Sequence, residues 1–225
     1  MDDGLRQVRA GRTPLRPDAP VWYVAYGSNM SAGRLRCYLA GGRPPGASRT
    51  YPGARDPRMP AASAPVELPG ALYFATHSPV WQGGRAFYDP TAPGTCWARA
   101  HLLTAAQLSD IAAQEMYEPP GRDLDLSPAL ATGHARLGPG RYETLVCPGA
   151  LHGHPLLTFT APWHLGDVPL TTPSAPYLRV IATGLHEAAH WPAPALAGYL
   201  ASRPGAAGHW TPEQVLDLLG EGAQP

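Results

Sequence analysis

The run Tyr26-Gly27-Ser28-Asn29-Met30 is the group of residues best suited to chemistry, and it follows a short apolar segment. Glycine allows a tight turn and a close approach of the backbone to a bound group. Backbone N–H groups at the start of a helix have no partner within the helix, so they attract a carboxylate or a developing oxyanion. The run therefore predicts an anion-binding cradle or, in its plainer interpretation, a strand–turn–helix connection in which Asn29 and Ser31 satisfy the backbone. A serine in such a turn more often makes a local hydrogen bond than acts as a nucleophile.

A second candidate is a carboxylate on a predicted helix. Thr104 and Gln107 form a Thr-x-x-Gln capping box, which marks the start of that helix. Its apolar face consists of Leu108, Ile111 and Ala112. Glu115 lies seven residues after Leu108 and so falls on the same face. A carboxylate on a buried face is either the structural partner of an arginine or an active-site group, and the sequence leaves both open.

A third candidate is an HExxH pattern formed by His186, Glu187 and His190. In zinc hydrolases the two histidines lie one helical turn apart, and the glutamate activates the metal-bound water. Gly184 and Pro192 flank the pattern and leave too little room for a stable helix of two turns. We therefore expect no metal site, and keep a zinc-dependent amide or peptide hydrolase, including a deacetylase, as an alternative.

The composition excludes several classes of protein. The 225-residue chain has 17 basic residues, all of them arginine, against 17 acidic residues. The lack of lysine excludes a Schiff base, a lysine-bound pyridoxal cofactor and a phosphate-binding loop with its lysine. Zero net charge argues against nucleic-acid or membrane-surface binding, and no apolar run approaches the ~20 residues of a membrane span. We expect a small-molecule partner, no nucleic acid and no membrane, with the oligomeric state left open.

The termini and cysteines predict a cytoplasmic protein. Met1-Asp2-Asp3-Gly4 is acidic and no apolar stretch follows it, so we expect no secretory signal. Cys37, Cys96 and Cys147 are an odd number at wide spacing, which fits reduced thiols better than a disulfide framework.

Apolar patterning predicts a mixed sheet with a few helices around it. The expected strands cover residues 21–26, 71–76, 85–88, 97–103, 131–137, 141–147 and 156–160. Helices are expected at 31–39, from Thr104 onward and twice within 194–219, with a short strand or a helix start at 177–181. We expect residues 1–20 to form a flexible arm and residues 21–225 a single domain. Pro and Gly number 28 and 25, and they predict long loops, above all at 41–65 and 116–125.

The stretch from Tyr23 to Met30 resembles the signature of the γ-glutamylcyclotransferase-like family, whose usual form is YGSNL. Further segments resemble that family in the same order along the chain. They are Gly83-Gly84-Arg85-Ala86 with Pro93-Gly94 and Trp97, then residues 108–115, then Pro173–Tyr177 with Gly184-Leu185. The resemblance covers about residues 21–200. It departs from the family pattern at Met30, in larger loops at 41–65 and 116–130, and after Glu115, where Met116-Tyr117 stand in place of glycine.

The resemblance implies an α+β fold, a small mixed β-barrel with peripheral helices. It implies an enzyme that cyclises a γ-glutamyl group to 5-oxoproline and releases an amine or peptide, without metal or cofactor. Glu115 would be the catalytic proton shuttle. The substrate-binding residues would be Tyr26, Gly27, Ser28, Asn29, Met30 and Tyr177. The departure after Glu115 leaves open a second hypothesis, a non-catalytic module that binds a glutamyl-like metabolite. The leaving amine is not readable from the sequence.

Overall fold

The computed structural model describes residues 14–44, 49–189 and 191–220. Backbone proximity divides the chain into two compact units. The first unit comprises Met1–Val24, Leu35–Ser63 and Ala100–Pro162, and the second comprises Ala25–Arg34, Ala64–Arg99 and Trp163–Pro225. Most of the expected N-terminal arm lies outside the described residues, and regular structure begins with β1 at Pro20. The single domain at 21–225 stays a prediction.

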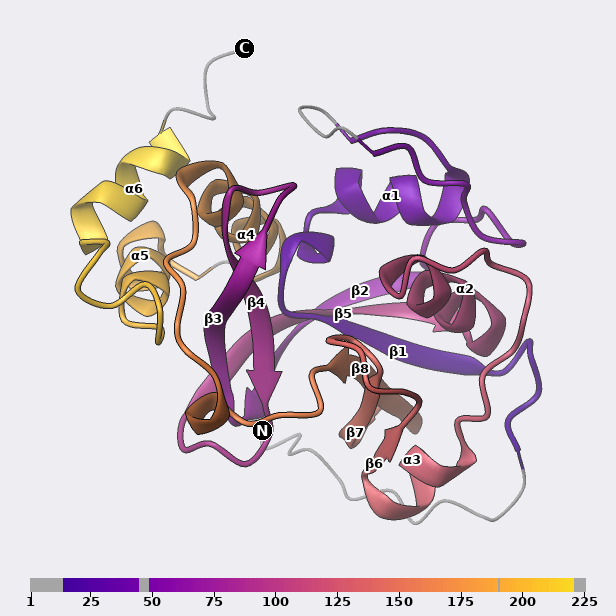
Figure 1. Cartoon of the computed structure of the whole chain (residues 1–225). Coiled ribbons are helices and arrows are strands. Elements are labelled where there is room, and N and C mark those ends of the chain that lie inside the picture. Colours follow the sequence, from indigo (N-terminus) through magenta and orange to yellow (C-terminus); the bar gives the residue numbers. More distant parts are fainter. Residues whose placement is uncertain (1–13, 45–48, 190, 221–225) are drawn as a thin grey trace. The chain divides into compact units, whose positions relative to one another are not determined.

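In the described part of the chain, eight strands form two sheets (Figure 1). A six-stranded sheet has the order β2-β5-β1-β8-β7-β6, and β3 and β4 form a two-stranded sheet. The strands are β1 (Pro20–Ala25), β2 (Ala62–Pro69), β3 (Ala71–Ser78), β4 (Gly83–Asp89), β5 (Thr95–Thr104), β6 (His134–Arg136), β7 (Thr144–Leu151) and β8 (His154–Thr160). The mixture of helices and strands agrees with the expected fold class. The closed barrel is not confirmed, because β2 and β6 are edge strands in this order and β3 and β4 form a sheet of their own.

The first unit contains the capped helix that the sequence predicted. This helix, α2 (Ala105–Glu115), begins with a complete capping box between Thr104 and Gln107. Two predictions in this unit were wrong in part. Residues 131–137 contain the end of α3 (Ser127–Thr132) before the strand β6, and β2 begins inside the expected loop at 41–65. Prolines in the β2 sequence indicated a loop, but an edge strand tolerates proline.

The second unit contains most of the remaining helices. They are α4 (Ala175–Ala189), α5 (Ala193–Ala201) and α6 (Pro212–Gly220), with the short 3-10 helices η1 (Ser28–Met30) and η2 (Leu165–Asp167). One further helix, α1 (Ala32–Ala40), begins in this unit and ends in the first. The length of α4 corrects one prediction, because Gly184 lies inside a helix of 15 residues rather than before a break. Gly184 instead allows α4 to pack closely against η1, as described for the site below.

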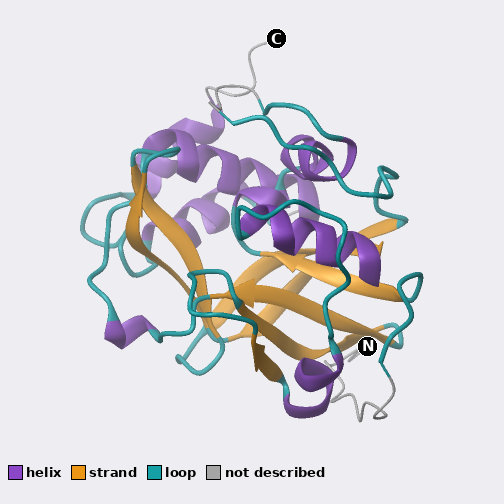
Figure 2. Cartoon of the chain, turned by 45° about the vertical axis from the view of Figure 1, so that its right-hand side comes forward, coloured by secondary structure: helices purple, strands orange, loops and turns teal. Residues whose placement is uncertain are grey.

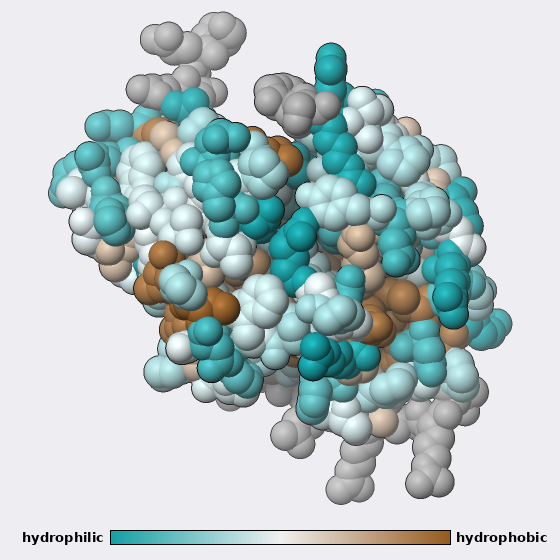
Figure 3. Space-filling view, in the orientation of Figure 1, coloured by the Kyte–Doolittle hydropathy of each residue, from teal (hydrophilic) through white to brown (hydrophobic). Residues whose placement is uncertain are grey.

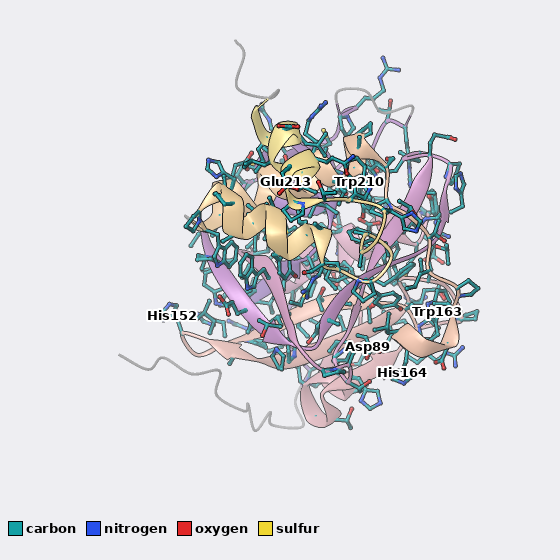
Figure 4. The ribbon with its side chains drawn as sticks, turned by 90° about the vertical axis from the view of Figure 1, so that its left-hand side faces the viewer. Asp89, His152, Trp163, His164, Trp210 and Glu213 are labelled. Atoms are coloured by element: carbon teal, nitrogen blue, oxygen red, sulfur yellow. The ribbon has the colours of Figure 1, made fainter. Side chains whose placement is uncertain are left out.

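A buried carboxylate joins the end of β4 to η2. The side chain of Asp89 accepts hydrogen bonds from the Leu165 N–H, from the Thr91 N–H and from the Thr91 hydroxyl. His164 lies beside it, with Nδ1 3.3 Å from Oδ1 of Asp89 (Figure 4). Burial alone would raise the pKa of Asp89, but these hydrogen bonds outweigh burial and lower the pKa to about 2.

Loops make up a large part of the molecule, as the glycine and proline content predicted (Figure 2). On the face drawn in Figure 3, hydrophobic residues occur in small areas separated by hydrophilic ones. The large hydrophobic side chains exposed in the described part of the chain are Met59, Tyr117, Leu170 and Leu216. No described helix has the length and apolar character needed to cross a membrane.

Candidate functional site

The turn that follows β1 belongs to the second unit and is tight. The Met30 N–H donates to the Gly27 carbonyl and the Ser31 N–H to the Ser28 carbonyl, which forms η1. No side chain caps the start of η1, whose N-cap residue is Gly27. Ser31 directly precedes α1, as the sequence predicted. The backbone of this turn, which no side chain caps, therefore lies at the point where the sequence predicted an anion-binding cradle.

An arginine that the sequence analysis missed holds the serine of this turn. The Nε of Arg34 donates to the Ser28 hydroxyl at 2.8 Å, and the Arg34 side chain is buried, at 8% exposed. Its guanidinium lies 5.1 Å from the ring centre of Trp81. The hydrogen bond supports a local structural role for Ser28 rather than a nucleophilic one. The sequence feature that could have indicated this contact is the position of Arg34, in the first turn of the helix that follows the motif.

Tyr177, on the first turn of α4, lies against the same turn. Its hydroxyl accepts a hydrogen bond from the Ala86 N–H, and a Cβ atom at Gly27 would lie 3.3 Å from that hydroxyl oxygen. Trp81 stacks on the Tyr177 ring with the ring centres 4.9 Å apart. The structure thus brings together all the predicted binding residues of the second unit: Tyr26, Gly27, Ser28, Asn29, Met30 and Tyr177.

The end of the turn packs against α4 at Gly184. A Cβ atom at Gly184 would lie 2.6 Å from the Cβ of Met30 and 2.7 Å from the nitrogen of Ser31, closer than real Cβ atoms come. Met30 is fully buried, so its side chain is part of the packing, and its carbonyl accepts a hydrogen bond from Arg99. Tyr26 is also buried, and its ring lies 5.9 Å from that of Tyr88.

The glutamate of the HExxH pattern, Glu187, contacts an arginine and the start of a helix. Oε2 of Glu187 lies 2.9 Å from Arg99 and accepts a hydrogen bond from the Ala32 N–H, at the start of α1. His186 is exposed, and His190 lies outside the described residues. Within residues 14–44, 49–189 and 191–220, no group of three His, Cys, Asp or Glu side chains could hold a metal ion. The contacts of Glu187 are those of an arginine partner and a helix cap, not of a base beside a metal-bound water.

Glu115, the predicted proton shuttle, lies in the first unit as the last residue of α2. Leu108 and Ile111 on the same helix are fully buried, but Glu115 is only half-buried, so the expected inward face ends before it. The adjacent Gln114 is fully buried, and its amide donates to the carbonyls of Tyr38 and Asp110.

A row of buried polar side chains on α2 holds two loops of the first unit. Asp110 is completely buried and accepts hydrogen bonds from the backbone N–H and Nε of Arg55 and from the Gly121 N–H. Arg55 also pairs with Asp123, and these two carboxylates raise the pKa of Arg55. Ser109 accepts a hydrogen bond from the Leu124 N–H.

Gln107 extends this row to the first of the two loops, because its amide donates to the carbonyls of Asp56 and Arg58. The segments 55–58 and 121–124 are therefore fixed to the helix that ends in Glu115. The sequence analysis identified both long loops but none of these contacts.

The chain then reverses at Tyr117. The Glu118 N–H donates to the Ala113 carbonyl at 2.8 Å, and Tyr117 has a left-handed backbone with φ of 64°. The guanidinium carbons of Arg49 and Arg141 lie 4.3 and 5.0 Å from the centre of the Tyr117 ring.

Comparison with known proteins gives partial likenesses. No family model matches the chain. Over 208 residues, 80% of the chain is 28% identical to histone deacetylase 5 of Arabidopsis thaliana, and the match spans 31% of that protein. A solved γ-glutamyl cyclotransferase is 15% identical, with a TM-score of 0.48 over 90% of this chain and 99% of that one. An uncharacterized protein from Homo sapiens is 16% identical, with the same TM-score over 88% and 97% of the two chains. Likenesses of this size say nothing about activity.

Proposed function

We propose that the chain is a γ-glutamylcyclotransferase-like enzyme, which converts a γ-glutamyl amide to 5-oxoproline and releases an amine or peptide. The observation that carries the proposal is the turn at Gly27. The motif on which the resemblance rests forms an uncapped backbone turn, with the Tyr177 hydroxyl over its glycine and Arg34 on its serine. We assign to this turn the α-carboxylate and the γ-carbonyl oxygen of the substrate, because backbone N–H groups stabilise both a carboxylate and a developing oxyanion.

Glu115 supplies the proton transfer in this proposal. Its carboxylate takes a proton from the substrate α-ammonium, and the freed nitrogen attacks the γ-carbonyl carbon. The bond from that carbon to the leaving nitrogen then breaks as Glu115 returns the proton to the departing amine, and the ring nitrogen gives its second proton to water, which leaves the neutral lactam of 5-oxoproline. Nucleophile and electrophile belong to one substrate, so the enzyme mainly has to fix a folded-back conformer, for which effective molarities reach about 10⁵–10⁸ M. No nucleophilic side chain takes part.

The test replaces Glu115 with Gln, which keeps the shape of the side chain and removes the base. Release of 5-oxoproline from a panel of γ-glutamyl amines should fall by about 10²–10⁴-fold, the usual contribution of general acid–base catalysis. Glu118→Gln is the matched control, because Glu118 is an exposed glutamate three residues later. An unchanged rate in Glu115→Gln would refute the assignment.

The same experiment separates the alternatives. Binding of a γ-glutamyl amine without 5-oxoproline after long incubation would favour the non-catalytic module. A zinc hydrolase, including a deacetylase as the name of the Arabidopsis protein suggests, requires stoichiometric zinc that is lost with His186→Ala. The ion pair of Glu187 with Arg99 argues against this second alternative.

A further inference from the structure

Glu187, the glutamate of the HExxH pattern, makes contacts that point to a role other than metal chemistry. Its Oε2 atom accepts two hydrogen bonds, from the Ala32 N–H at 3.1 Å and from Nη1 of Arg99 at 2.9 Å. The same Nη1 atom of Arg99 donates to the Met30 carbonyl, also at 2.9 Å. One guanidinium nitrogen therefore joins a carboxylate on α4 to the carbonyl of the last residue of η1.

These contacts lie within one part of the molecule. All four residues belong to the second unit, as does the whole turn from Tyr26 to Ser31. The side chain of Arg99 is 13% exposed and that of Glu187 is 36% exposed. Hydrogen bonds between charged groups are about twice as strong as neutral ones, and partial burial limits their screening by salt. The pair is therefore suited to holding a segment of backbone in place.

η1 has few internal contacts that would keep it closed. It comprises three residues, and no side chain caps its start. Its backbone bond from the Met30 N–H to the Gly27 carbonyl is 3.1 Å long, near the upper limit for a hydrogen bond of this kind. A single helical turn is unstable unless tertiary contacts support it. The conformation of this turn therefore depends on side chains from other segments.

Arg99 acts on the backbone bond that closes the end of the turn. The Met30 carbonyl belongs to the peptide group that joins Met30 to Ser31, and the N–H of that group donates to the Ser28 carbonyl at 3.2 Å. A cation at the carbonyl oxygen of a peptide group polarises the group, which makes its N–H a stronger donor. Arg99 therefore strengthens a long hydrogen bond within the turn, and Glu187 holds Arg99 in position for this contact.

We propose that Glu187 and Arg99 are positioning residues, which keep the Gly27 turn in the closed form that binds the glutamyl end of the substrate. This rests on the function proposed above, which assigns the substrate α-carboxylate and γ-carbonyl oxygen to the turn. Neither side chain touches the substrate in this proposal. Where the turn is open in part of the molecules, the apparent affinity falls with the closed fraction, whereas the bound, closed complex reacts at its usual rate.

The experiment compares Arg99→Gln, which removes the charge and shortens the side chain, with Arg99→Lys, which keeps a charged donor. In Arg99→Gln, KM for 5-oxoproline release from γ-glutamyl amides should rise about 10-fold, the usual worth of a hydrogen bond to a charged group, with kcat within about twofold. Arg99→Lys should restore most of the loss in KM. Glu187→Ala should also raise KM, and its effect should shrink in the Arg99→Gln background, because Glu187 acts mainly through Arg99.

Arg203→Gln is the matched control. Arg203 is also a partly buried arginine of the second unit, and it donates to the carbonyls of Thr95 and Tyr199. None of its hydrogen bonds in the described part of the chain reaches the turn, so its loss should lower thermal stability without a change in KM. An equal rise in KM in Arg99→Gln and Arg203→Gln overturns the proposal. So does a fall in kcat at constant KM, which a loss of folded protein alone would produce.

Amide hydrogen exchange keeps the two proposals apart, because it reports the opening of the turn without any substrate. Exchange at the Met30 and Ser31 amides should become about 10-fold faster in Arg99→Gln and stay unchanged in Arg203→Gln. Such a change in a protein that forms no 5-oxoproline supports the hold on the turn and overturns the cyclotransferase function. Formation of 5-oxoproline with exchange and KM unchanged in Arg99→Gln overturns the positioning role and leaves that function intact.

Glu187→Gln repeats the comparison where Arg99→Gln does not fold. This variant keeps the shape of the side chain and an acceptor oxygen for the Ala32 N–H, and it loses the charge that pairs with Arg99. KM and the exchange rate of the Ser31 amide should both rise, by a smaller factor than in Arg99→Gln. No change in either quantity overturns the proposal.

Discussion

The Gly27 turn and the end of α2 both carry proposed site residues, but they are built in opposite ways. At the turn, glycines remove side chains so that backbone segments can touch, as Gly184 does against Met30. At the end of α2 a tyrosine occupies a position where the backbone favours glycine, and polar side chains reach out to hold the loops. Close packing against Gly184 distinguishes the first region, which Arg34 and Arg99 also hold by hydrogen bonds, whereas buried polar side chains hold the loops of the second.

This difference teaches where each region can vary. The contact with Met30 and Ser31 leaves no space for a side chain at position 184, so we expect this position to tolerate no larger residue. The loops beside α2 are held at separate points by Gln107, Ser109 and Asp110, so we expect the exposed residues between these points to tolerate substitution better.

Gly184→Ala tests the close packing and should have the largest effect. The added methyl group meets Met30 and the Ser31 backbone, and we expect a loss of about 3 kcal/mol in the free energy of unfolding, the upper end of overpacking. Gly198→Ala is the matched control, because Gly198 lies in α5 with nothing within 4 Å of its Cβ position; it should gain about 0.5–1 kcal/mol. Denaturant unfolding of both variants measures the difference, and equal shifts would show that the contact at Gly184 is not tight.

The region around the Gly27 turn was the easiest part of the structure to predict from the sequence. The apolar segment from Val21 on, the glycine and the serine before the helix are neighbours in the chain, so local rules located β1, the turn and α1. The HExxH segment shows where local rules failed. Gly184 indicated a helix end, but its reason is a contact with residues more than 150 positions earlier, which no local pattern contains.

Arg55→Gln tests the polar construction of the α2 region and should have an intermediate effect. Asp110 is fully buried but the Arg55 side chain is 40% exposed, so we expect a loss between the ~0–1 kcal/mol of an exposed pair and the about 3–5 kcal/mol of a buried one. Arg58→Gln breaks an arginine–aspartate pair in the same loop whose arginine is 80% exposed, and it should change the stability little. Thermal unfolding midpoints of the two variants should differ, and similar midpoints would contradict the special role of Asp110.

The contacts of Asp110 could not be predicted, although its helix could. The capping box and apolar spacing located α2, and they drew attention to Glu115. Arg55 and Asp123 lie 55 and 13 residues from Asp110 along the chain, and only folding brings the three together. The same holds for Arg49 and Arg141, whose common contact with Tyr117 joins three separate loops.

Replacing Tyr117 with Gly and with Ala separates backbone strain from side-chain contacts, and the difference between the two variants is the smallest expected here. Both variants lose the ring and its contacts with the arginines, but only glycine relieves the left-handed conformation. Tyr117→Gly should therefore be about 1 kcal/mol more stable than Tyr117→Ala in denaturant unfolding. Equal stability of the two would mean that the helix ends with a different backbone in solution.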